Sequence, residues 1–113
     1  MRYEIMANTV IKIDLHNNYS VVAFAKWNVE TEKYSVDLYI KENTIDHLDL
    51  LDDYKNIIFE SDIKSIKTDI TKYIETLYNE GKIERYIKRS EYELKCFNIG
   101  NEIISTSKEV QIR

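Results

Sequence analysis

Alternating apolar and polar residues predict three β-strands in the first third of the chain. Apolar side chains occupy every second position in residues 9–15, 19–27 and 34–40, which is the period of a strand with one buried face. The second of these segments is apolar on both faces over part of its length, so we expect it to be the central strand. A turn signal at His16-Asn17-Asn18 and the polar residues 28–33 join the segments. The pattern therefore predicts an antiparallel meander.

Two later segments have the period of amphipathic helices. After Ser61 or Asp62, which are candidate N-caps, apolar residues recur at intervals of three and four, and Gly81 lies just past the end: Ile63, Ile66, Ile70, Ile74 and Leu77. A second helix is predicted from Lys82 to about Asn98. Gly100 closes it, and its apolar residues are Ile83, Tyr86, Ile87, Leu94 and Phe97. We expect both helices to cover one face of the sheet.

Three further segments have weaker patterns. A short acidic helix is predicted from Asn43 or Thr44, which can cap it, to about Tyr54, because apolar residues there recur at helical spacing: Ile45, Leu48 and Leu51. Residues 56–60 are predicted to be an edge strand or an extended connector. The tail, residues 102–113, contains apolar residues without a clear period, so it is either a strand or frayed.

The order of these elements predicts an α+β fold, in which a three-stranded antiparallel meander, with a possible fourth edge strand, is backed by two to three helices. A chain of 113 residues has room for one hydrophobic core, so residues 1–113 are expected to form a single domain. The apolar share of 43% and the aromatic share of 12% argue against disorder, although 32% of the residues are charged.

Cysteine usage and hydropathy indicate the compartment. Cys96 is the only cysteine, which excludes an internal disulfide framework and fits a reducing environment. The apolar stretches before Leu15 are interrupted by charged and polar residues, unlike a signal peptide. No segment has the roughly 18 to 20 consecutive apolar residues of a membrane span. We therefore expect a cytoplasmic protein without a membrane partner.

Catalytic signatures are sparse, so we expect a protein that is not an enzyme. Both glycines are predicted helix ends, which disfavours phosphate-binding loops. Cys96 lacks an adjacent base, because His16 lies in a predicted turn and His47 in the short helix. His47 is surrounded by aspartates, but their spacing fits neither a zinc site nor a calcium loop, and a solvated acidic face is favoured. We expect no cofactor and no metal.

The strongest charge feature is the acidic segment from Glu42 to Asp62, in which seven acidic residues face the single base Lys55. In a helix, Asp46, Asp49 and Asp53 would form one stripe that repels itself until a cationic partner binds. Such a stripe could occupy the basic groove of a nucleic-acid-binding protein, although an ordinary solubilising face is the alternative. The candidate partner-binding residues are Asp46, Asp49, Asp52, Asp53, Tyr54 and Glu60.

Basic residues gather on the last predicted helix, where Lys82, Arg85 and Arg89 share one stripe. With neighbouring tyrosines, this stripe could bind nucleic acid through phosphate contacts and base stacking. Salt bridges within the helix, such as Glu84 to Lys88, explain much of the same pattern. A small nucleic-acid-binding or regulatory protein is therefore the alternative function. The third hypothesis is a homo-oligomerising structural module, such as a homodimer, which pairs with itself through an open sheet edge or an exposed Tyr/Ile surface.

In composition and charge, rather than in any motif, the chain resembles accessory proteins of phages and mobile elements of AT-rich, Gram-positive bacteria. It is short, acidic and rich in Ile, Lys, Asn, Asp and Tyr. Through the acidic stretch 42–53 it resembles small inhibitors of host defence such as anti-CRISPR proteins, many of which block the nucleic-acid groove of a nuclease. The resemblance implies a non-catalytic, protein-binding inhibitor of a CRISPR effector in the cytoplasm of the host bacterium.

Overall fold

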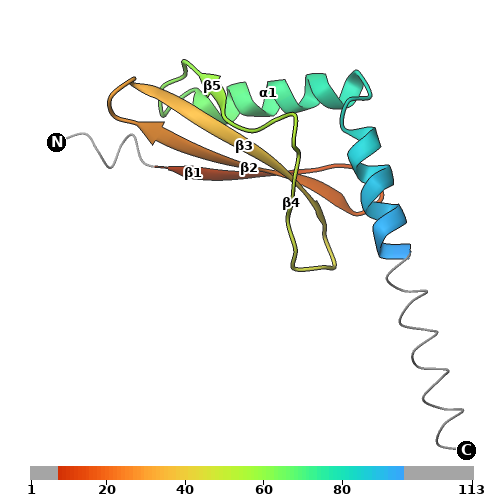
Figure 1. Cartoon of the computed structure of the whole chain (residues 1–113). Helices are drawn as coiled ribbons and strands as arrows, with labels where there is room; N and C mark the ends of the chain where they lie inside the picture. The colour runs from red at the N-terminus through yellow and green to blue at the C-terminus, as the bar shows by residue number, and fades with distance from the viewer. Residues whose placement is uncertain (1–7, 96–113) are drawn as a thin grey trace, which may run out of the picture.

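A computed structural model describes residues 8–95 and contains the predicted α+β fold. Three long strands form an antiparallel meander: β1 (Thr9–Asp14), β2 (Tyr19–Asn28) and β3 (Lys33–Glu42). Two short strands pair with the far edge of β3, namely β4 (Asp49–Leu50) and β5 (Ile57–Phe59) (Figure 1). Residues 56–60 thus contain an edge strand, which decides between the two alternatives left open by their sequence.

The turn between β1 and β2 follows directly from two asparagines. Asn17 and Asn18 have φ values of 56° and 62°, and the Tyr19 N–H donates to the His16 carbonyl over 3.2 Å. Two successive residues with positive φ define the type I′ turn, whose twist matches that of the paired strands. Asparagine tolerates this conformation better than most residues, so the turn signal in the sequence is confirmed.

β2 is the central strand of the meander, as predicted, because β1 pairs with one side of it and β3 with the other. Its inward residues Val21, Ala23 and Ala25 lie in the core. On the opposite face, Val22 is also buried, and the Phe24 ring packs edge-to-face on Tyr39 with centroids 5.2 Å apart. In the described part of the chain, the second apolar face of β2 therefore packs against side chains of the sheet itself.

Helix α1 (Ile66–Asn79) presents a continuous apolar stripe to the sheet. Ile66, Ile70, Ile74 and Leu77 are all buried, which confirms the predicted period. The helix begins later than expected because residues 63–65 form a turn. In that turn the Asp62 carboxylate accepts the backbone N–H groups of Lys64 and Ser65 over 3.0 and 2.8 Å.

The end of α1 is a Schellman motif centred on Gly81. The Lys82 N–H donates to the Leu77 carbonyl over 2.9 Å, and the Gly81 N–H donates to the Tyr78 carbonyl over 3.1 Å. Gly81 has a φ of 76°, a conformation that costs energy for any residue with a Cβ atom. The chain then enters a second helix, residues 84–95, which reaches the last described position. Cys96, Phe97, Gly100 and the tail 102–113 lie outside the described residues.

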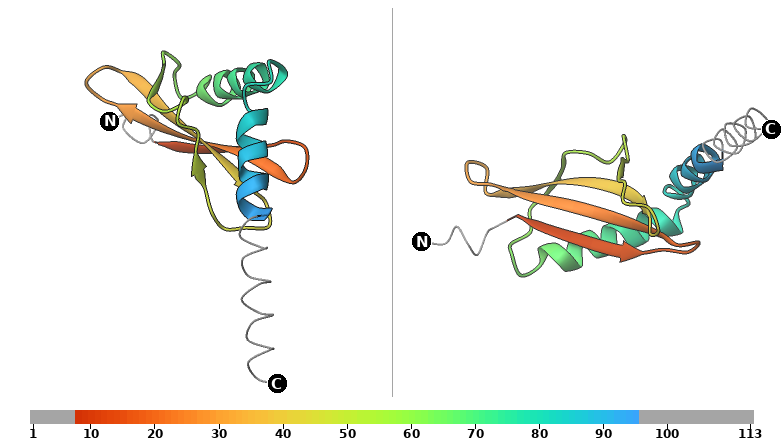
Figure 2. Two further views of the ribbon diagram at one scale, coloured as in Figure 1. Left: turned by 45° about the vertical axis from the view of Figure 1, so that its right-hand side comes forward. Right: turned by 90° about the horizontal axis from the view of Figure 1, so that it is seen from below.

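The two helices occupy different places around the sheet. α1 lies along one face, whereas the helix 84–95 crosses the end of the sheet near the β1–β2 turn and the β3–β4 loop (Figures 1 and 2). Both nevertheless contribute to one core, which contains Ile70 and Ile74 from α1 and Ile87 from the second helix. Neither helix within residues 8–95 is long and apolar enough to cross a membrane.

Candidate functional site

The acidic segment after β3 is extended, so the predicted short helix at residues 43–54 is wrong. β4 places Asp49 opposite Ile40, and the Leu51 N–H donates to the Leu38 carbonyl over 2.9 Å. The Leu38 N–H in turn donates to the Tyr54 carbonyl over 2.9 Å. Pairing with the edge of β3 outweighs the local helical spacing because it satisfies the backbone groups of both segments and buries Leu51 completely. The expected aspartate stripe therefore does not form.

Two of the candidate acidic residues contact basic residues of the same chain. Asp53 forms an ion pair with Arg85, and Asp52 Oδ2 lies 3.8 Å from Arg89 Nη1. The acidic segment and the basic helix were predicted as separate surfaces, but the structure joins them. The four side chains are 45–71% exposed, so each ion pair contributes at most about 1 kcal/mol to stability.

Tyr86 lies at the centre of this contact and connects it to the core. The side chain is only 4% exposed, and its hydroxyl donates to Asp53 Oδ2 over 2.8 Å. The Tyr86 hydroxyl oxygen also accepts two hydrogen bonds, from the Asp53 backbone N–H over 3.3 Å and from Arg85 Nη2 over 3.0 Å. The guanidinium carbons of Arg85 and Arg89 lie 4.8 and 5.1 Å from the ring centroid. We call Asp52, Asp53, Arg85, Tyr86 and Arg89 the clamp.

The remaining candidates have different surroundings. The ring of Tyr54 packs against Tyr86 with centroids 6.3 Å apart, so it supports the clamp from the core side. Glu60 follows β5 and forms an ion pair with Lys33 at 3.0 Å, away from the β3–β4 loop. The structure therefore does not bring all six candidate residues into one surface. Asp46 and Asp49, which lie in or next to the β3–β4 loop, remain together.

Lys82, the third member of the predicted basic stripe, is also paired. Its Nζ lies 2.9 Å from Glu80 Oε1, and this hydrogen bond to a carboxylate raises the pKa of Lys82 above its usual value. All three bases proposed to contact nucleic acid thus have a carboxylate partner within the chain. Any phosphate would have to compete with these carboxylates for the basic groups.

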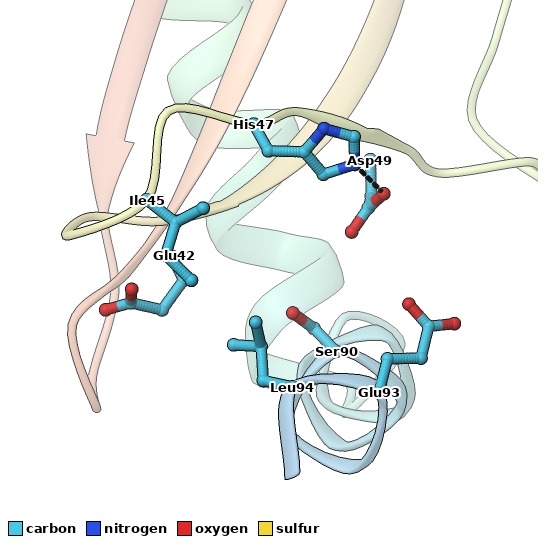
Figure 3. A pocket seen from close by; sticks show the side chains of 7 residues that line it. All are labelled: Glu42, Ile45, His47, Asp49, Ser90, Glu93 and Leu94. Carbon is cyan, nitrogen blue, oxygen red and sulfur yellow. Dashed lines mark hydrogen bonds and ion pairs between the residues drawn. The ribbon is translucent and has the colours of Figure 1, made fainter. Parts of the chain in front are cut away.

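A pocket opens between the β3–β4 loop and the helix 84–95, with a volume of about 220 Å³. Figure 3 shows that its walls come from segments about forty residues apart in the sequence. Glu42, Ile45, His47 and Asp49 line it from the loop, and Ser90, Glu93 and Leu94 line it from the helix. Three of the seven lining residues are acidic, so the pocket favours a cationic group. We call it the acidic pocket.

Hydrogen bonds within the acidic pocket fix two of its carboxylates. His47 Nε2 lies 2.9 Å from Asp49 Oδ1, which leaves the second Asp49 oxygen directed toward the helix (Figure 3). The Glu42 carboxylate instead accepts the backbone N–H and the hydroxyl of Thr44. Within residues 8–95, no group of three histidine, cysteine, aspartate or glutamate side chains is arranged to hold a metal ion.

Sequence reasoning missed the pocket residues on the helix. Ser90 and Glu93 had no pattern that separated them from other positions, since Glu93 was only one of several acids on a mixed helix, and Leu94 was predicted only as part of the apolar face of that helix. His47 was considered as a metal ligand and as a base for Cys96, but not as part of a pocket. The signal is absent from the sequence because the pocket depends on where the β3–β4 loop meets the helix, which no local spacing encodes.

Comparison with known proteins does not identify a family for this chain. No protein-family model, no curated protein and no solved structure matches the chain.

Proposed function

We propose that this chain is a non-catalytic, protein-binding inhibitor of a nucleic-acid enzyme, with a CRISPR nuclease as the first candidate partner. The observation that carries the proposal is a group of acidic residues at one end of the sheet, Glu42, Asp46 and Asp49, which we call the acidic end. None of the three has a lysine or arginine partner within 4 Å in the described part of the chain. Their charge is therefore available to a basic partner, whereas that of the clamp is largely used internally.

The position of the acidic end supports contact with a groove. The β3–β4 loop extends from the end of the sheet, where Asp46 is exposed and Asp49 is half-buried (Figure 1). Carboxylates on such a projection can replace the phosphates that a nuclease binds with lysine and arginine. The choice of a CRISPR nuclease follows from the resemblance of residues 42–53 to inhibitors of host defence. The partner itself is to be identified by experiment.

A charge-reversal experiment tests this proposal. Purified CRISPR nucleases are mixed with the protein, and capture and target cleavage are measured at increasing salt. The variant Asp46→Lys/Asp49→Lys should bind and inhibit at least tenfold more weakly than the wild type, because each reversal replaces attraction by repulsion. Affinity of the wild type should fall as salt rises, since the contact is electrostatic.

A matched control separates position from total charge. Glu30→Lys/Glu75→Lys changes the net charge equally, but Glu30 lies in the β2–β3 turn at the other end of β3 and Glu75 is an exposed residue of α1. This variant should inhibit nearly as well as the wild type. Equal inhibition by both variants would contradict the role of the acidic end. Failure of the wild type to bind or inhibit any nuclease would refute the proposed partner class.

A further inference from the structure

We propose that the acidic pocket binds the guanidinium group of an arginine side chain presented by the protein partner. This inference rests on the proposed function, since it names the group that the pocket would take from a basic groove. It also has its own basis in the geometry of the pocket. Three features carry it: a hydroxyl that opens into the pocket, two carboxylates from facing elements, and apolar walls.

Ser90 supplies the first feature. It is 8% exposed, and its hydroxyl, for which the described residues offer no hydrogen-bond partner, is open to solvent, because no buried side-chain nitrogen or oxygen within residues 8–95 lacks a partner. Its oxygen points into the pocket, away from Glu93 and on the side of Leu94 (Figure 3). A polar group that opens into a pocket can bind a ligand that displaces its water, so this hydroxyl is placed to contact a ligand.

The carboxylates of Asp49 and Glu93 supply the second feature. Both line the pocket, and they come from facing elements, β4 and the helix (Figure 3). Arg89 Nε lies 3.9 Å from Glu93 Oε1, which is too long for a hydrogen bond, so both Glu93 oxygens can still accept one. Two carboxylates and a hydroxyl provide several acceptors for one donor-rich cation.

The shape of the pocket favours arginine over other cations. Ile45 and Leu94 form an apolar side opposite the carboxylates (Figure 3), which suits the methylene stem of a long side chain. The planar guanidinium offers five N–H donors in a fixed fork, whereas an ammonium is a compact and strongly hydrated charge. The volume of about 220 Å³ is below the roughly 300–1,000 Å³ of small-molecule sites, so it fits one side chain better than a cofactor.

Binding of capped amino acids to the full-length protein tests the inference without any nuclease. N-acetyl-arginine amide is titrated into the isotope-labelled chain at low salt, and amide chemical shifts are followed by NMR. Shifts should centre on residues 45–49 and 90–94, and N-acetyl-lysine amide should bind at least fivefold more weakly. Shifts elsewhere, equal affinity for the two compounds, or no binding up to high millimolar concentration would each overturn the proposal.

Substitutions in the pocket provide the second measurement. Glu93→Gln should weaken arginine binding about tenfold, because the hydrogen bond from the guanidinium would then have a neutral acceptor instead of a charged one. Ser90→Ala should weaken it about threefold to tenfold. Glu91→Gln, which removes the same charge from an exposed position on the same helix, should change it less than twofold. If Glu91→Gln and Glu93→Gln weaken binding equally, only general charge attraction is present and the pocket has no specific role.

The two proposals can fail separately. If nucleases are inhibited through the acidic end but arginine does not bind the pocket, the pocket inference falls and the proposed function stands. If arginine binds as expected but no nuclease is inhibited, the pocket stands and the partner must be a different arginine-bearing protein.

Discussion

Removing one hydroxyl from the clamp tests how the acidic segment is held on the second helix. Tyr86→Phe keeps the aromatic ring, which packs on Tyr54 and beneath two arginines, and deletes only the oxygen. That oxygen takes part in three hydrogen bonds: to the Asp53 carboxylate at 2.8 Å, from the Asp53 N–H at 3.3 Å and from Arg85 at 3.0 Å. The variant therefore isolates the polar part of the contact from its packing.

The expected cost follows from the partners and their exposure. A hydrogen bond to a charged group contributes about 1.5–3 kcal/mol, and a neutral one about 1 kcal/mol. The Asp53 side chain is 57% exposed, so water replaces much of what it loses. We expect Tyr86→Phe to lower the free energy of unfolding by about 1–1.5 kcal/mol. For a domain of this size, that corresponds to a decrease in Tm of roughly 4–10 °C.

Urea unfolding monitored by circular dichroism measures this loss of stability. A double-mutant cycle with Asp53→Ala shows how much of it comes from the contact between Tyr86 and Asp53. The coupling free energy between the two positions should be about 0.5–1 kcal/mol. Tyr39→Phe is the matched control, because the Tyr39 hydroxyl has no hydrogen-bond partner in the described part of the chain, and it should be nearly neutral. A coupling energy near zero, or equal costs for the two tyrosine variants, would refute the clamp as an energetic link.

Three further substitutions have expected outcomes that unfolding measurements can check. Gly81→Ala should cost about 1 kcal/mol through its φ of 76° alone, since no atom lies within 4 Å of the added Cβ; an unchanged stability would contradict the Schellman end. Ser20→Ala should cost about 1–3 kcal/mol, because the fully buried Ser20 hydroxyl lies 2.8 Å from the Asp14 carboxylate. Hydrogen bonds from Ser65 lower the pKa of Asp62 below 3.8, so its stabilisation is complete above that pH and is lost as the pH falls through the lower folded value. Asp62→Asn should therefore show a smaller loss of stability between pH 5 and pH 2 than the wild type, and an identical loss would be inconsistent with this role.

Local patterns were sufficient for most of the fold. The strand pattern of residues 19–27 and the stripe of Ile66, Ile70 and Ile74 were visible because each element buries one face at its own period. The turn at Asn17-Asn18 and the stop at Gly81 were also readable, since only certain side chains tolerate positive φ. In these places the local preference and the tertiary environment agree.

The acidic segment shows where local patterns fail. Residues 45–52 have helical spacing, yet they contain a short strand and no helix, because the open edge of β3 offers hydrogen bonds to Leu51 and Tyr54. Leu51 is fully buried as a result. Pairing with the preceding strand leaves no trace in a window that covers only the segment itself, so a helix was the reasonable local prediction.

The sequence by itself determined the types of the long elements, the central strand and the signs of the two charged segments, since these depend on side-chain period and composition. Only the tertiary structure decided that the charged segments meet. Asp53 and Arg85 are far apart in the chain and form an ion pair, while Ser90 and Glu93 face His47 and Asp49 across a pocket. The physical reason is that charge is a property of single residues, whereas neutralisation and pocket formation depend on distances that only the packed chain sets.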